Sequence, residues 1–210
     1  MRAWRRGVAG FSVACMLTVA PAFAQAPSQT SGRDPGRFIS DLGQQVIQLI
    51  GDKQQPAPAR KQRFAGIVEK AFDMSGIARF ILGPYWRSAS EQQRANFEQT
   101  FKTYMINVYW SDFSQYSGQQ LTVSGEHPAS ANATIVSSEI VQNNGKPPVK
   151  VDWRVMTANG DYKIADVSIA GVSELITYRQ EFANVISQAG GNVDALTDQL
   201  RKKVQQIGGA

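Results

Sequence analysis

Two Asn-Gly dipeptides, Asn144-Gly145 and Asn159-Gly160, separate three segments in which apolar and polar residues alternate. A two-residue hairpin turn requires positive φ at both central positions, and Asn-Gly meets this requirement better than most dipeptides. If both dipeptides form such turns, counting outwards from each turn fixes which residues face each other. The sequence therefore predicts an antiparallel meander of three strands with a defined register.

The predicted register divides the side chains of the meander between the two faces of a sheet. One face pairs Val136 with Trp153, Ser138 with Val151, Ile140 with Val149, and Val155 with Ile164. The other face pairs Glu139 with Lys150, which indicates contact with solvent. We therefore expect helices to cover the apolar face, and a further strand over residues 120–126 brings the predicted sheet to four strands.

The predicted register does not fit the apolar pattern near the end of the last strand. A strict register would place Asp166 beside Trp153 and would turn Val167 and Ile169 towards the charged face. One extra residue returns the apolar side chains to the covered face, so we expect a β-bulge at Ala165-Asp166.

The first 24 residues have the pattern of a signal peptide. Arg2, Arg5 and Arg6 precede an uncharged apolar run over residues 8–19, and Ala22-Phe23-Ala24 predicts cleavage after Ala24. We interpret residues 25–33 as a flexible lead-in and residues 34–210 as a single domain. The expected location is the periplasm.

Removal of this leader changes the composition in two ways. It takes away Cys15, the only cysteine, so the mature chain can form no disulfide and no thiolate metal site. It also takes away three of the 22 Lys and Arg residues, against 17 Asp and Glu, and lowers the net charge from +5 to about +2. This balance argues against nucleic acid as a partner.

Helix start and stop signals predict six helices in the mature chain. Asp34 is the expected N-cap of the first, Asp73 of the third, and Ser90 with Gln93 forms a capping box before the longest. The expected spans are residues 35–51, about 58–72, 74–81, 91 to about 116, about 172–189, and 193 to about 207.

The longest helix carries a strongly aromatic stripe: Phe97, Phe101, Tyr104, Met105, Val108, Tyr109 and Phe113. Such a stripe is typical of ordinary core, and it is also a suitable cover for the concave face of a sheet. We expect an α+β fold in which a curved antiparallel four-stranded sheet is covered by several helices and encloses an apolar cavity.

The residues needed for common enzymatic chemistry are scarce. His127 is the only His and stands in a segment, Glu126-His127-Pro128, that we interpret as a surface turn. Ser173 lacks the second Gly of a nucleophile elbow and is better placed to cap a helix. Asp166 could be a catalytic carboxylate, or it could accept backbone N–H groups at the bulge. With no phosphate loop or metal-ligand spacing, the sequence predicts neither an enzyme nor a cofactor.

Abundant apolar surface, arranged as a long helix and a cupped sheet, points to an apolar ligand. Withdrawing a diacyl lipid exposes on the order of 30 methylenes at ~0.8 kcal/mol each, or about 25 kcal/mol in total. Only a deep dry pocket could replace the bilayer as an environment for such a ligand.

An ordered series of short motifs extends over nearly the whole mature chain: Phe72-Asp73; Gly83 with Trp86-Arg87; Ser90-x-x-Gln93-x-x-x-Phe97-x-x-x-Phe101; Tyr162-x-Ile164-x-Asp166-Val167; Gly171-Val172-Ser173; and Tyr178-Arg179-x-x-Phe182. The series resembles the MlaC (toluene-tolerance Ttg2D) family. The resemblance implies a periplasmic carrier that holds phospholipid tails between a curved sheet and helices. It also implies exchange between an outer-membrane lipoprotein complex and the lipid-binding subunit of an inner-membrane ABC transporter.

Two positions depart from the family pattern. Tyr162 stands where a Trp is common, and Ala170 replaces a frequent acidic residue. The chain is also similar to the branch encoded beside hopanoid-biosynthesis genes, so the implied ligand is a phospholipid or a rigid pentacyclic hopanoid.

We interpret the apolar residues of the long helix, the sheet and the following segment as lipid contacts, with ordinary core as the alternative for each. They are Phe101, Tyr104, Met105, Val108, Val136, Val151, Trp153, Val155, Ile164, Val167, Val172 and Ile176. Two other functions stay open: a cone-shaped enzyme that uses Asp166 as a base on an isoprenoid-like substrate, and an adaptor with a filled core.

Overall fold

The computed structural model describes residues 34–114, 118–142, 145–158 and 160–208. The expected signal peptide and lead-in lie outside the described residues, as do Asn144 and Asn159 of the two predicted turns. Within the described part the fold is α+β, with seven helices and one antiparallel sheet of five strands that does not close. No helix in this part combines the length and the apolar character that crossing a membrane requires.

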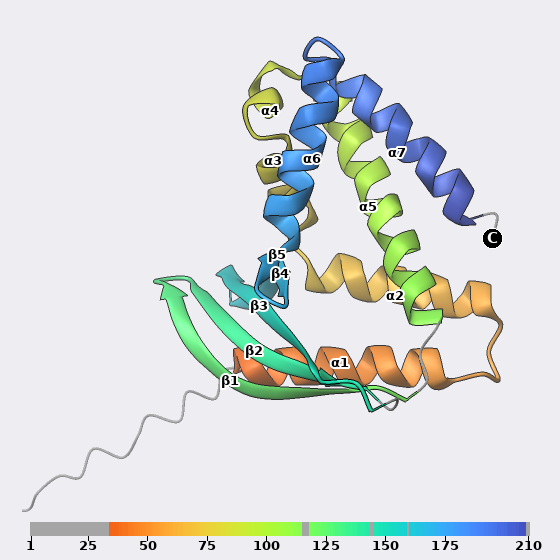
Figure 1. Ribbon diagram of the computed structural model, residues 1–210, viewed down its shortest axis with the longest axis vertical. Coiled ribbons are helices and arrows are strands. Elements are labelled where there is room, and N and C mark those ends of the chain that lie inside the picture. Colours follow the sequence, from red (N-terminus) through yellow and green to blue (C-terminus); the bar gives the residue numbers. More distant parts are fainter. Residues whose placement is uncertain (1–33, 115–117, 143–144, 159, 209–210) are drawn as a thin grey trace, which may run out of the picture. The chain divides into compact units, whose positions relative to one another are not determined.

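The elements follow one another in the order helices, strands, helices (Figure 1). The helices are α1 (Pro35–Gly51), α2 (Ala57–Ala71), α3 (Met74–Leu82), α4 (Pro84–Ser88), α5 (Glu91–Ser114), α6 (Glu174–Gln188) and α7 (Val193–Gly208). The strands are β1 (Gln120–Ser130), β2 (Ala133–Val141), β3 (Val149–Ala158), β4 (Asp161–Ile169) and β5 (Val172–Ser173). They lie in the sheet in sequence order.

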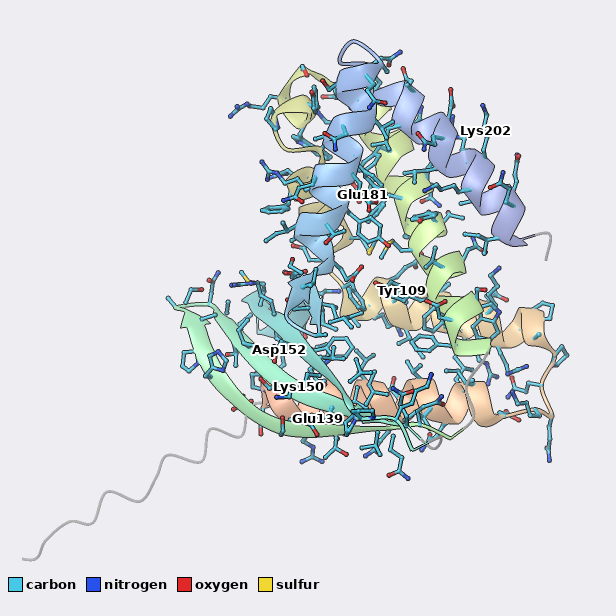
Figure 2. The ribbon with its side chains drawn as sticks, in the orientation of Figure 1. Tyr109, Glu139, Lys150, Asp152, Glu181 and Lys202 are labelled. Atoms are coloured by element: carbon cyan, nitrogen blue, oxygen red, sulfur yellow. The ribbon has the colours of Figure 1, made fainter. Side chains whose placement is uncertain are left out.

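The register of the meander is confirmed. The pairs include Val136 with Trp153, Ser138 with Val151, Ile140 with Val149, Glu139 with Lys150, and Val155 with Ile164. Glu139, Lys150 and Asp152, which are labelled in Figure 2, therefore belong to the face opposite Trp153.

The predicted bulge is also confirmed. Val155 pairs with Ile164 and Arg154 pairs with Asp166, so that Ala165 has no partner across the strands. Beyond this extra residue, Val167 faces Trp153 and Ile169 faces Val151. The bulge thus returns both apolar side chains to the covered face, which a strict register would not do.

The strand count of four is wrong. Ala170 and Gly171 have φ of 50° and 84°, and this turn directs Val172-Ser173 back to pair with Ile169 and Ser168 as β5. Because Ser173 is also the N-cap of α6, the strand ends after two residues, too few to leave a sequence pattern.

The expected turn around His127 is also wrong. His127 lies in β1 opposite Ile135, and β1 continues to Ser130 rather than ending near Glu126. Two register shifts, between Val123 and Gly125 and between Pro128 and Ser130, let the strand continue past the proline.

The helix caps agree with the sequence. Asp34 Oδ1 accepts a hydrogen bond from Gly36 N at 2.8 Å. Ser90 and Gln93 form the reciprocal capping box, with distances of 3.1 Å for Gln93 N to Ser90 Oγ and 3.0 Å for Ser90 N to Gln93 Oε1. The sequence did not predict α4, which follows Gly83 at φ 52° with Pro84 at its first position.

The helix that lies directly on the strands is α1, and not the long aromatic helix as expected. A Cβ added to Gly43 of α1 would lie 3.2 Å from Leu121 of β1, so the glycine allows close approach. The stripe of α5 is divided between two environments. Phe97 and Phe101 share a buried cluster with Phe182 of α6 and Leu200 of α7. Helix α7 packs along α5 (Figure 1). The rest of the stripe, Met105, Tyr109 and Phe113, borders the pocket described below.

Candidate functional site

An apolar pocket of about 520 Å³ lies between the helices and the sheet. This volume is within the range of roughly 300–1,000 Å³ that is usual for ligand sites. Residues of three separate buried clusters line it: Ile81 and Phe101 from the first cluster, Ile39 from the second and Phe64 from the third. The pocket is therefore the space that these clusters leave between them.

The helical walls of the pocket come from regular spacing along α1 and α5. On α1, lining residues recur every three or four positions, at Ile39, Leu42, Val46 and Ile50. On α5 they recur at Phe101, Met105, Tyr109 and Phe113. Further apolar side chains line it from α2 and α3: Phe64, Ile67, Val68, Met74, Ile77 and Ile81.

The sheet wall is organised around Trp153. Its indole Nε1 donates to Ser138 Oγ at 2.9 Å, and Ser138 Oγ donates to the carbonyl oxygen of Val151 at 3.0 Å. Because the indole N–H is satisfied within the sheet, the ring can border an apolar space without an unpaired polar group. Val149, Val151 and Val167 line the pocket beside it.

The lining becomes polar where α5, β4 and α6 contribute to it. Asp112, Asp166 and Glu174 line the pocket there, together with Tyr109, which is labelled in Figure 2, and Tyr178. Burial raises the pKa of both tyrosine hydroxyls, and carboxylates including Glu174 raise each pKa further. The site thus joins an apolar section to this polar one, and three glutamines in and beside β1 and β2 also line it: Gln119, Gln120 and Gln142.

Asp166 has a structural role in this polar section. Its Oδ1 accepts from Val167 N at 2.8 Å and from Leu175 N at 3.1 Å, and its Oδ2 accepts from Ser173 Oγ at 2.7 Å. The carboxylate therefore joins the bulge of β4 to the start of α6, as the structural interpretation of the sequence expected.

Glu174 gives a test of the electrostatics of this section. Burial, and then the charges of Asp166 and Glu181, raise its pKa above that of an exposed glutamate. The folded state therefore binds the proton more tightly than the unfolded state, and stability is lost as pH rises from the ordinary pKa to the raised one. Between about pH 4 and about pH 7.5, the melting temperature of the wild type is expected to fall by roughly 2 °C relative to Glu174→Gln.

Thermal unfolding of both proteins, free of lipid, across this pH range checks the expectation. A Glu91→Gln control should show a smaller change, because Glu91 is exposed and is not among the charges that raise the pKa of Glu174. Melting temperatures that change in parallel for wild type and Glu174→Gln would contradict the assignment.

Five of the twelve residues proposed from the sequence as lipid contacts line the pocket: Phe101, Met105, Val151, Trp153 and Val167. The other seven do not. Val136, Val155 and Ile164 are buried in a cluster with Ile39 of α1, while Tyr104 and Val108 occupy other faces of α5. Val172 and Ile176 are 59% and 50% exposed.

Sequence reasoning missed the walls that come from α1, α2 and α3. Their lining residues, such as Leu42, Val46, Ile67 and Ile77, have the helical spacing of ordinary core. The number of such helices was the signal that could have revealed these walls, because one face of a sheet cannot cover three apolar helix stripes. In the described part of the chain, no group of three or more His, Cys, Asp or Glu is placed to hold a metal ion.

Comparisons with known proteins agree on one family. A family model described as MlaC protein matches residues 40–202. The "Intermembrane phospholipid transport system binding protein MlaC" of Haemophilus influenzae is 28% identical over 129 residues, 60% of this chain and 59% of that protein. The toluene tolerance protein ttg2D of Pseudomonas putida is 24% identical over 133 residues, 63% of this chain and 61% of that protein. The chain thus spans about three fifths of the length of these curated relatives.

A solved structure shows the same fold. A phospholipid-binding protein from Ralstonia solanacearum, determined in complex with a phospholipid, has a TM-score of 0.72 and 23% sequence identity. The match covers 84% of this chain and 99% of that chain.

Proposed function

The chain belongs to the MlaC family, and from this membership and the apolar pocket we propose that it is a non-catalytic lipid carrier of the periplasm. The observation that carries the proposal is the pocket of about 520 Å³ bounded by α1, α2, α5 and the sheet. In this proposal the acyl tails occupy the apolar section, and the head group lies at the polar section near Tyr109 and Glu174.

The energetics of extraction support a pocket of this kind. Moving one methylene group from a bilayer into water costs about 0.8 kcal/mol, unless another dry environment receives it. The walls formed by Leu42, Ile67 and Met105 supply such an environment. The polar groups of the sheet wall are already paired, as in the bond from Trp153 to Ser138, so the tails would not compete with unsatisfied donors.

The proposed ligand is a phospholipid. A relative is named for intermembrane phospholipid transport, and a protein of the same fold was solved with a phospholipid bound. A hopanoid is the alternative ligand, because aromatic side chains such as Phe113 and Trp153 provide flat walls against which a rigid ring system could pack.

The proposed partners are two membrane complexes. The carrier would exchange its lipid with the lipid-binding subunit of an inner-membrane ABC transporter and with an outer-membrane lipoprotein complex. Binding alone equilibrates lipid between them, so direction would come from the ATP that the transporter hydrolyses or from a lipid gradient.

The proposal predicts that the protein retains lipid when it is purified from its own cell envelope without detergent. Native mass spectrometry should show a second species heavier by the mass of one lipid, and extraction followed by lipid analysis should identify the class. A diacyl phospholipid would support the principal ligand and a hopanoid the alternative. Protein that carries no lipid, and that gains none from vesicles, would contradict the carrier function.

A further inference from the structure

Four arginines gather on the surface formed by α3, α4, the start of α5, and α6. We name Arg79, Arg87, Arg94 and Arg179 the arginine patch. Figure 1 shows α3 beside α6, with α4 following α3. Two aromatic side chains, Trp86 and Phe80, lie among these arginines, and Phe80 is 40% exposed.

Aromatic rings pack against three of these guanidinium groups. The guanidinium carbons of Arg79 and Arg94 lie 5.6 and 5.4 Å from the centre of the Trp86 ring, and that of Arg179 lies 4.6 Å from the centre of the Phe80 ring. Each contact is within the range of a cation–π interaction. Trp86 therefore brings together charges from α3 and α5, and Phe80 holds a charge from α6.

Hydrogen bonds to backbone carbonyls fix two members further. Arg94 Nε donates to the Trp86 carbonyl oxygen at 2.7 Å, and Arg179 Nη1 donates to the Phe80 carbonyl oxygen at 3.1 Å. Gly83 contributes by its lack of a side chain, since an added Cβ would lie 2.9 Å from Arg179 Nη2. These guanidinium groups are ordered before any partner binds.

None of the four arginines forms an ion pair within the described residues. The three ion pairs found there join Arg37 to Asp41, Lys102 to Glu69, and Arg201 to Asp198, all outside the patch. Arg79 and Arg87 are exposed. On α3, Ile77 and Ile81 line the pocket. Arg79 is two positions from each of them, so it lies on the opposite face of the helix.

We propose that the arginine patch is a docking surface for an acidic face of a protein partner in lipid exchange. This inference rests on the proposed function and assigns the part of the carrier that meets one of its membrane complexes. Arginine and tryptophan are enriched at protein interfaces, and ordered side chains lose little freedom on binding. The patch contains no lysine, whereas flexible polybasic segments are typical of contact with anionic lipid.

The test compares two variants that each remove two exposed charges. Arg79→Gln with Arg87→Gln removes the members of the patch that make no hydrogen bond to a carbonyl. The matched control, Lys53→Gln with Lys202→Gln, removes exposed cations from the α1–α2 loop and from α7, where Lys202 is labelled in Figure 2. Association is measured at low salt with the purified inner-membrane transporter complex, with the outer-membrane lipoprotein complex, and with phosphatidylglycerol vesicles.

The patch variant is expected to bind one of the two complexes about tenfold more slowly than the control, and this difference should shrink as salt is added. Its lipid content should equal that of the wild type, and its melting temperature should fall by no more than about 4 °C, the loss expected for the contact of Arg79 with Trp86. Equal association of patch variant and control with both complexes would overturn the inference, as would a loss confined to the vesicles. A wild type without lipid would instead refute the carrier function, so the two failures are distinguishable.

Discussion

A double variant, Leu42→Trp with Met105→Trp, is expected to lose its co-purified lipid while it keeps its fold. The two positions belong to opposite helical walls of the pocket, α1 and α5, and both are only partly buried. Two indole rings would occupy space that the acyl tails need. Loss of only ten methylene contacts removes about 8 kcal/mol of binding free energy, which would abolish detectable occupancy.

The matched control is Val108→Trp with Ile176→Trp, because neither position lines the pocket and Ile176 is half exposed. Lipid per protein is measured by native mass spectrometry, and folding is monitored by circular dichroism. Full lipid occupancy in a folded Leu42→Trp, Met105→Trp protein would show that this pocket does not hold the ligand.

Replacement of Asp166 by Ala should produce the largest loss of stability of any single change at the polar section. It removes acceptors for Val167 N, Leu175 N and Ser173 Oγ, and leaves two backbone donors without their charged partner. The expected decrease in the free energy of unfolding is about 3 kcal/mol, which corresponds to roughly 9 °C in melting temperature.

Asp166→Asn separates this structural role from catalysis. The amide oxygen of Asn can still accept from both backbone N–H groups, and its NH₂ group can donate to Ser173 Oγ, so the cost should be about 1 kcal/mol. The folded variant should keep its lipid. If Asp166 were instead the base of an enzyme acting on an isoprenoid-like substrate, Asp166→Asn would abolish turnover with little change in ligand binding.

The strand register could be predicted because it depends on local features. Two Asn-Gly dipeptides and the alternation of side chains were enough to pair Val136 with Trp153 and to place the bulge at Ala165. Helix caps such as Asp34 were predictable for the same reason, since each depends on residues within one turn. The fifth strand escaped prediction because a two-residue pairing leaves no periodic signal.

The arrangement of helices around the sheet could not be predicted in the same way. The stripes of α1 and α5 are both apolar, and sequence spacing does not say which one lies on the strands. Gly43 permits the close approach of α1 to Leu121, a relation between residues 78 positions apart that local spacing does not reveal.

The size and borders of the pocket also could not be predicted from any single segment of the sequence. Whether Val46 or Ile67 borders filled or empty space depends on how far the neighbouring elements stand apart. Ser138 is an example: although its side chain is small, it is 2% exposed and accepts the hydrogen bond that holds the Trp153 ring.

The irregular course of β1 has a consequence for how copies of this protein meet one another. β1 is an outermost strand, and it is interrupted by two register shifts and by Pro128, which has no N–H to donate. A straight outer strand would invite a neighbouring molecule to extend the sheet. The irregular edge of β1 offers no such continuous row of hydrogen-bonding groups, so this edge is protected against sheet-to-sheet association into fibres at high protein concentration.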